Sequence, residues 1–287
     1  MARRSGKAAG GEPLASLSEL RERYLERERP VPKDLLEALD TDGRAGAKAL
    51  AKAIRARQAA RRSEGQRLRH MLKFETGLYE QGYRLIAGVD EAGMAPLAGP
   101  VVAGAPILPR GYKLEGLDDS KKILDEDKRA RFAAEIKKHA VAWASGWASV
   151  DEVDTLNIYH AGLLAMRRAV EGLQVQPDFV LVDARKIPQI PQPQRGIIKG
   201  DALSLSIAAG AMIAKTTRDA YMATLDAKYP GWGFATHKGY PTPEHLEAIA
   251  RLGVCEVHRR SFAPVKKALG LLPEQEELFA PAQVGAK

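Results

Sequence analysis

Four consecutive apolar residues, Phe179 to Val182, followed directly by Asp183, are the feature that most constrains how this chain can fold. A strand with one face in water alternates apolar and polar residues, whereas an unbroken apolar run is typical of a strand buried on both faces. Such a strand belongs to a sheet that has helices on both sides. The run therefore predicts an α/β sheet and places a carboxylate at the carboxyl end of one of its strands.

The segments around this run favour the same fold class. Short strands are expected at Arg84–Val89, Pro100–Leu108 and Gly196–Gly200. Amphipathic helices are expected at Asn157–Leu173 and Leu203–Tyr229. Strands followed by alternating helices and strands predict a mixed sheet flanked by helices.

Three further carboxylates follow predicted strands. Asp90 and Glu91 come after the first strand, in a glycine-rich turn, and Asp201 comes after the strand that ends at Gly200. Each of them alone fits a turn residue or a helix N-cap. If the strands are neighbours, these side chains and Asp183 converge at one end of the sheet, where carboxylates repel one another unless cations neutralise them. Oxygen ligands without cysteine point to Mg²⁺ or Mn²⁺, and two such ions support displacement at a phosphodiester.

The excess positive charge is confined to one segment. The chain has 44 Lys and Arg against 36 Asp and Glu, and residues 41–73 carry 10 basic and 2 acidic side chains. We therefore expect a basic helical extension at 41–81, preceded by a variable, partly flexible segment at 1–40. Three interpretations stay open for the extension: a contact for nucleic acid, a solvated helix without a partner, and a contact for another protein.

Composition excludes several other classes of protein. No stretch approaches the roughly 18–20 apolar residues of a membrane-spanning helix, so no membrane partner is expected. No apolar run follows the charged N-terminus, so no secretory signal is expected. Cys255 is the only cysteine, which excludes a disulfide within the chain and a metal site built on cysteines. We expect a monomer in the cytoplasm.

Blocks of sequence surround the four acids in a fixed order. They are Tyr83–Gly93, Pro96–Val102, Asp119–Lys122, Leu181–Asp183, Ile198–Asp201, Ser206–Ala209, His237–Tyr240 and His258–Phe262. Together they resemble the signature of the bacterial ribonuclease HII family. The resemblance implies a ribonuclease H-like catalytic domain at 82–268 and a C-terminal tail at 269–287. It also implies an endonuclease that cleaves RNA in RNA–DNA hybrids or ribonucleotides embedded in DNA, leaving 3′-hydroxyl and 5′-phosphate ends.

The resemblance implies roles for particular residues. The family's four metal-binding carboxylates correspond to Asp90, Glu91, Asp183 and Asp201, with two Mg²⁺ or Mn²⁺ ions when substrate is bound.

Other positions correspond to contacts with the nucleic acid. Ser120 and Lys121 match a phosphate-contacting motif, although they also fit the approach to a helix. Tyr240 matches a tyrosine that packs on the sugar at an RNA–DNA junction, although it also fits an anchor for its loop. Candidate contacts with the nucleic-acid backbone are Lys199, Lys215 and Arg218. Lys215 and Asp219, at i,i+4, fit a salt bridge at least as well.

One turn departs from the family pattern. Gly93, Met94 and Ala95 stand where the family usually has Gly-Arg-Gly, a turn whose backbone reads the 2′-hydroxyl. Ala95 adds a methyl group where glycine permits positive φ or a close approach, and Met94 removes a cation. Cleavage should persist, with less strict recognition of a single embedded ribonucleotide. The alternative is a hybrid-binding paralogue with weak cleavage.

Overall fold

The computed structural model describes residues 15–118, 120 and 123–272. The chain divides into two compact units, Met1–Arg69 and His70–Lys287. The elements, in chain order, are α1 (Leu17–Arg21), η1 (Glu22–Glu26), α2 (Leu35–Thr41), α3 (Ala47–Met71), α4 (Lys73–Glu80), β1 (Ile86–Ala92), β2 (Val101–Ile107), α5 (Glu126–His139), β3 (Ala142–Ala148), α6 (Val150–Leu156), α7 (Ile158–Glu171), β4 (Phe179–Asp183), β5 (Gln194–Ile197), α8 (Gly200–Leu203), α9 (Leu205–Lys228), α10 (Phe234–His237), α11 (Pro243–Leu252) and α12 (Ala263–Ala268).

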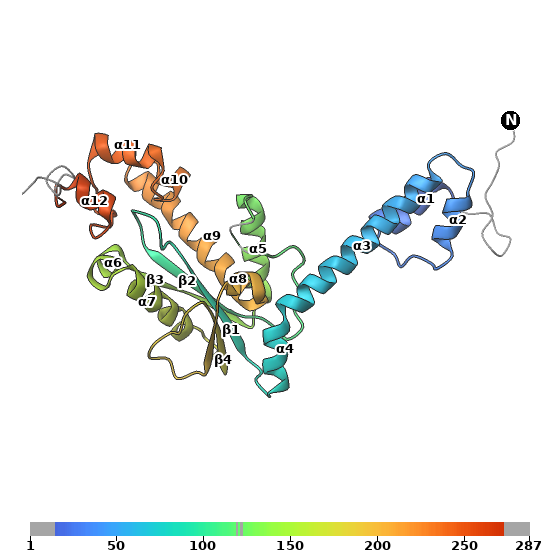
Figure 1. The fold of residues 1–287 in the computed structure, drawn as a ribbon, viewed down its shortest axis with the longest axis horizontal. Helices are drawn as coiled ribbons and strands as arrows, with labels where there is room; N and C mark the ends of the chain where they lie inside the picture. The colour runs from blue at the N-terminus through green and yellow to red at the C-terminus, as the bar shows by residue number, and fades with distance from the viewer. Residues whose placement is uncertain (1–14, 119, 121–122, 273–287) are drawn as a thin grey trace, which may run out of the picture. The chain divides into compact units, whose positions relative to one another are not determined.

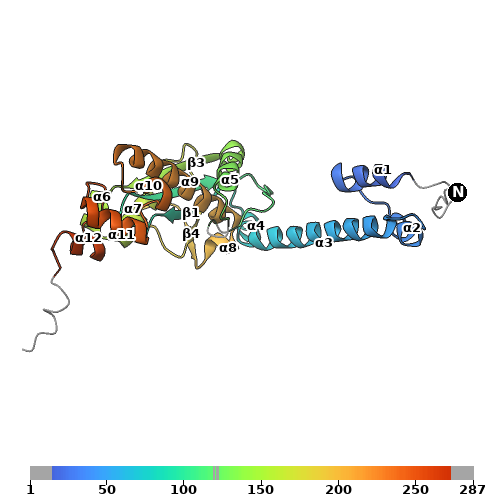
Figure 2. The same cartoon turned by 90° about the horizontal axis from the view of Figure 1, so that it is seen from above.

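The first unit packs short helices against the N-terminal half of α3. Leu20 and Leu39 bury their side chains with Leu50 and Ile54 of α3. The residues of α3 between these apolar positions are mostly Ala, Lys and Arg, which favour helix, and the helix passes through Gly65 without a break (Figures 1 and 2). The basic segment predicted from the sequence is therefore helical.

The second unit is built on a five-stranded mixed sheet in the order β3-β2-β1-β4-β5. The pairs β1–β2 and β2–β3 are antiparallel, whereas β1–β4 and β4–β5 are parallel. Val180, Leu181 and Val182 of β4 are fully buried, as the apolar run predicts. The predicted fold class, a mixed sheet flanked by helices, is confirmed.

Helices cover both faces of the sheet (Figure 1). Ala87 and Val89 of β1 pack in one core cluster with residues of α7, while Gly88, between them, faces α9. A Cβ atom on Gly88 would lie 2.0 Å from the carbonyl carbon of Ser206, which is closer than atoms can approach. Glycine at this position thus lets the backbone of α9 rest directly on the strand that carries Asp90.

The bounds of β1 differ from the prediction. The strand continues through Ala92, so Asp90 and Glu91 lie within it and not in the turn that follows. The reason is pairing with β2, which places Asp90 opposite Gly104 and Glu91 opposite Ala103.

The predicted long helix is also divided. Ser204 is extended and begins α9, its hydroxyl accepting a hydrogen bond from the Ile207 N–H at 3.2 Å, so the preceding residues form the separate helix α8. The strand expected at 196–200 ends earlier, at Ile197, because Lys199 adopts a left-handed φ of 58°.

Helix α4 packs within the second unit. Phe74 and Leu78 lie against Ile86 of β1, and the buried Glu75 accepts hydrogen bonds from the Ser204 hydroxyl at 2.7 Å and the Ser206 N–H at 3.0 Å. The boundary expected between residues 81 and 82 stays a prediction, and the compact units divide earlier in the chain. In the described part of the chain, no helix has the length and apolar character needed to cross a bilayer.

Candidate active site

Two carboxylates meet at one edge of the sheet. The strands β1 and β4 are parallel with Val89 opposite Val182, so the next residue on each strand, Asp90 and Asp183, reaches the same edge. Val89 and Val182 pack in the core cluster that contains α7, so both aspartates point to the opposite face, where α9 lies. The convergence expected from the sequence is present for this pair.

A third carboxylate, Asp201, comes from the short helix α8. The left-handed Lys199 turns the chain after β5, and the Gly200 N–H then donates a hydrogen bond of 2.7 Å to Asp183 Oδ1. This bond ties the start of α8 to the end of β4. Asp201 is 7% exposed and lies close enough to Asp90 to raise the pKa of that carboxyl group.

Burial and mutual repulsion favour protons on this cluster. Asp90 is 7% exposed, and burial raises the pKa of its carboxyl group well above the usual value, an effect that Glu91, Asp183 and Asp201 reinforce. Burial also raises the pKa of Glu91, although the positive charge of Arg185, whose Nη2 lies 3.3 Å from Glu91 Oε1, opposes the shift. A divalent cation at this edge would favour the charged carboxylates and displace those protons.

The donor set fits a hard divalent cation. All four side chains offer carboxylate oxygens, and Glu91 Oε2 is buried without a hydrogen-bond partner. As the side chains stand, no three described acidic, histidine or cysteine residues surround a common point. Asp183 Oδ1 accepts from the Gly200 N–H, and Asp201 Oδ1 accepts from the Ala202 N–H at 3.0 Å.

The turn that follows β1 is held by a buried arginine, Arg259. Its guanidinium donates hydrogen bonds to the carbonyl oxygens of Gly93 at 2.7 Å, Pro96 at 2.7 Å and Gly99 at 2.8 Å. Burial, reinforced by the charge of Arg218, lowers the pKa of Arg259 to about 9, so the guanidinium remains charged at neutral pH. A single side chain thus fixes the whole turn next to the acidic edge of the sheet.

Comparison with known protein families decides where the chain belongs. The model described as Ribonuclease HII matches residues 87–265, and the model described as Ribonuclease HII N-terminal domain matches residues 16–79. The chain belongs to the ribonuclease HII family.

Individual relatives agree with this membership. The chain is 63% identical to Ribonuclease HII of Myxococcus xanthus (strain DK1622), over 95% of this chain and 96% of the relative. It is 59% identical to Ribonuclease HII of Anaeromyxobacter sp. (strain Fw109-5), over 93% and 84%. The crystal structure of the ribonuclease H2 from Pyrococcus horikoshii OT3 matches 64% of this chain and 96% of that one, with a TM-score of 0.55 and 24% identity, which supports the fold.

Family membership makes the chain an enzyme, a nuclease of the ribonuclease H type. The ribonuclease HII family acts on RNA–DNA hybrids, and enzymes of this type depend on metal ions. A solved structure with the same fold, Bst-RNase HIII, is described as a complex with Mn²⁺.

Tyr240, matched by the ribonuclease HII resemblance to a sugar contact, is 37% exposed. Its carbonyl oxygen accepts a hydrogen bond from Nδ1 of the buried His245 at 2.8 Å. Lys215 Nζ lies 5.7 Å from the centroid of the Tyr240 ring and 2.9 Å from Asp219 Oδ1. The i,i+4 ion pair expected as an alternative for Lys215 is therefore present, and it holds the ammonium group beside the aromatic ring.

The structure contradicts the expectation for Arg218. This residue is 1% exposed, and its guanidinium donates to the carbonyl oxygens of Pro100 at 3.0 Å, Lys238 at 2.9 Å and Ala98 at 2.9 Å. Because all three nitrogens are engaged inside the protein, Arg218 does not contact a nucleic-acid backbone. Instead it joins the turn after β1 to the loop that carries Tyr240.

The remaining candidate contacts differ in their surroundings. Lys199 is exposed beside the carboxylates, where a nucleic-acid backbone could reach it. Ser120 is half-buried in a turn, and Lys121 lies outside the described residues.

The turn at Gly93, Met94 and Ala95 needs a positive φ at only one of these residues. Gly93 has the positive φ, 96°, and is buried, whereas Ala95 is exposed and has no positive φ. Ala95 therefore does not occupy a position that needs a positive φ, and the effect of its methyl group on a close approach of the nucleic acid stays a prediction. Met94 packs against the core cluster, with its sulfur next to Gly162, so its side chain serves the packing of α7.

Sequence reasoning missed Arg185. Its charge partly offsets the acidic cluster at Glu91, and its guanidinium lies 5.1 Å from the centroid of the Tyr159 ring. The sequence signal for Arg185 was its position two residues after Asp183, the acid that ends the buried strand β4.

Proposed function

We propose that this chain hydrolyses the RNA strand of RNA–DNA hybrids, or a ribonucleotide embedded in duplex DNA, at the carboxylate cluster of Asp90, Glu91, Asp183 and Asp201. One observation supports this most: the ends of two adjacent parallel strands present Asp90 and Asp183 on one face, and a bond from α8 brings Asp201 beside them. Mg²⁺ or Mn²⁺, with two ions present when substrate is bound, would supply activation of water and stabilisation of the leaving oxygen.

The chain's own residues prepare this reaction. The carboxylates of Asp90, Glu91, Asp183 and Asp201 would hold the cations, whose positive charge would oppose the raised pKa values of Asp90 and Glu91 and favour their charged forms. Water adds to phosphorus while the bond from phosphorus to O3′ breaks. The leaving oxygen takes a proton and becomes a 3′-hydroxyl, and the phosphate stays on the 5′ end of the other product.

The substrate lies between the acidic edge and the loops around it. Tyr240 packs on a sugar, the backbone of Gly93, Met94 and Ala95 faces the 2′-hydroxyl, and Ser120 and Lys121 contact a phosphate. Lys199 is exposed and Lys215 is half-buried, and the ammonium groups of both can contact the phosphate backbone. Action as a monomer and location in the cytoplasm stay predictions.

The test is a cleavage assay on an end-labelled hybrid, with Mg²⁺ or Mn²⁺ titrated into metal-free enzyme. Asp90→Asn should lower kcat at least about a hundredfold, since a metal ligand supplies several kcal/mol of charge stabilisation and each 1.36 kcal/mol is tenfold in rate. The matched control is Asp151→Asn, an exposed acid at the start of α6. Tight binding of the hybrid by the unaltered chain without product at any metal concentration would contradict the proposal and favour the hybrid-binding paralogue.

A further inference from the structure

Of the seven arginines between residues 44 and 69, four pair with acids close to them. Arg44 pairs with Asp42, Arg55 with Asp40, Arg57 with Glu28 and Arg67 with Glu64. These pairs leave three arginines of α3, Arg61, Arg62 and Arg69, with no carboxylate within 4.0 Å in the described part of the chain. The unpaired charge of the basic segment therefore includes a group of three arginines in the C-terminal half of α3.

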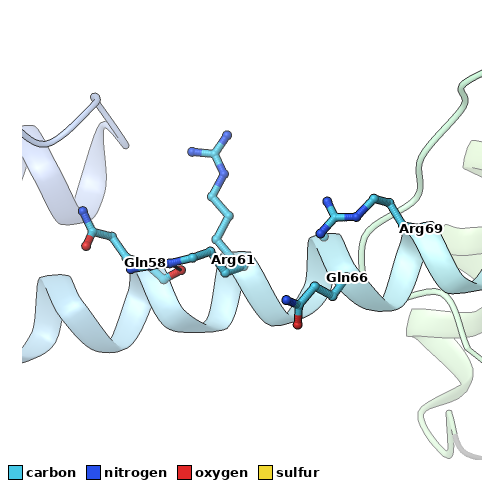
Figure 3. A pocket seen from close by; sticks show the side chains of 6 residues that line it. Gln58, Arg61, Gln66 and Arg69 are labelled. Carbon is cyan, nitrogen blue, oxygen red and sulfur yellow. Dashed lines mark hydrogen bonds between the residues drawn. The ribbon is translucent and has the colours of Figure 1, made fainter.

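These three arginines lie on one face of the helix. With Gln58, Gly65 and Gln66 they recur every three to four residues and line an open concavity of about 590 Å³ (Figure 3). Arg61 extends away from the helix, whereas Arg69 runs back along it, with a guanidinium nitrogen 3.6 Å from where a Cβ atom on Gly65 would be. We call these six residues the arginine face.

Gly65 is the unusual member of the arginine face. A glycine inside an exposed helix costs about 1 kcal/mol relative to alanine, and α3 tolerates one in the middle of its 25 residues. Because Gly65 has no side chain, the guanidinium of Arg69 can lie over the helix at this position, 3.6 Å from where a Cβ atom would be. Glycine therefore leaves room for Arg69 to turn toward Arg61 and Arg62 along the same face.

The chemistry of the arginine face selects a phosphate backbone. Guanidinium groups bind phosphate oxygens in a bidentate manner, and glutamine side chains donate to phosphates and sugars. No aromatic or apolar side chain lines the concavity, so the face has no platform on which a base could stack and no apolar stripe that could enter a lipid surface. From Arg62 to Arg69 the helix rises about 10 Å, which matches about three nucleotide steps of 3.4 Å.

We propose that the arginine face of α3 is a second nucleic-acid site, which binds the phosphate backbone without reading the sequence or the sugar. It acts independently of the carboxylate cluster. Because a backbone contact ignores the 2′-hydroxyl, the face contributes equally to the binding of an RNA–DNA hybrid and a DNA duplex.

The test measures binding of the full chain to a fluorescent hybrid and to a DNA duplex of the same sequence, in chelator, over about 50–200 mM salt. The variant replaces Arg61, Arg62 and Arg69 by Gln, which keeps helix propensity. With about 0.9 of slope per phosphate contact, the dependence of log K on log salt should become shallower by about 2 to 3 for both duplexes. Since the chelator prevents cleavage, the result does not depend on the nuclease reaction proposed above.

Two further variants sharpen the test. Arg55→Gln removes the same charge from the same helix, but Asp40 already neutralises this arginine, so the slope should stay nearly constant. Gly65→Glu places a carboxylate four residues from both Arg61 and Arg69 and should weaken binding, whereas Gly65→Ala should weaken it less. An unchanged slope and affinity in the triple variant, with circular dichroism showing an intact helix, would overturn the proposal and favour a protein contact.

Discussion

The turn after β1 depends on one charged side chain, and removing that side chain tests the argument for the site. Arg259→Met keeps an unbranched apolar stem and removes the donors to Gly93, Pro96 and Gly99. Hydrogen bonds from a charged donor are worth about 1.5–3 kcal/mol each, so the three bonds together represent about 5–9 kcal/mol. Because the variant no longer buries a charged guanidinium, it avoids a desolvation cost of several kcal/mol, which offsets part of the lost hydrogen-bond energy. The expected net loss of unfolding free energy is about 3–5 kcal/mol.

Urea denaturation of the metal-free chain measures this loss, and Arg260→Met is the matched control. Arg260 is the next residue, exposed to solvent, so its replacement should change the unfolding free energy by less than about 0.5 kcal/mol. Arg259→Lys retains a charge but presents one ammonium group to three carbonyl oxygens, and it should lie between the two. If Arg259→Met costs less than about 1 kcal/mol, the carbonyl oxygens have found other donors and Arg259 does not hold the turn.

Two other predictions concern the same edge of the sheet. Met94→Arg combined with Ala95→Gly should increase the ratio of cleavage at a single embedded ribonucleotide to cleavage of a long hybrid, by up to about a hundredfold if a bond to the 2′-hydroxyl is regained. Since Met94 packs against the core cluster that contains α7, urea denaturation of the variant checks that it is folded, and an unchanged ratio in the folded variant would contradict the role given to this turn. In metal-free protein the raised pKa of Asp90 makes the folded state bind more protons than the unfolded state, so stability should fall as pH rises from about 4 through the raised pKa. Asp90→Asn should reduce this loss of unfolding free energy with rising pH, as measured by urea titrations at several pH values. Equal pH profiles for the variant and the unaltered chain would show that Asp90 does not carry the raised pKa.

Some of the fold and site could be predicted from short-range patterns. The apolar run of β4 predicts a strand buried on both faces, and Asp183, which follows the run, lies at the carboxyl end of that strand. Whether β1 and β4 are neighbours was left open by the sequence, and their parallel pairing in the structure brings Asp90 and Asp183 to the same end of the sheet.

Other features depend on contacts between distant segments, which no local pattern reveals. Asp90 and Glu91 are extended within β1 because β2 pairs with them, although their glycine-rich surroundings favour a turn. Arg218 resembled a surface cation on a helix, but three carbonyl oxygens from two other segments surround it. Those oxygens offset the cost of burying its charge, and only the folded chain brings them together.

The pairing of β1 with β4 also sets the time at which the enzyme can first work. During synthesis β1 and β2 leave the ribosome early, and α5, β3, α6 and α7 follow before β4 can join β1. If the four acids form the proposed cation site, a nascent chain that ends before β4 and α8 lacks Asp183 and Asp201 and should not cleave a hybrid. On the proposal for the arginine face, the same truncated chain should still bind a nucleic acid through α3.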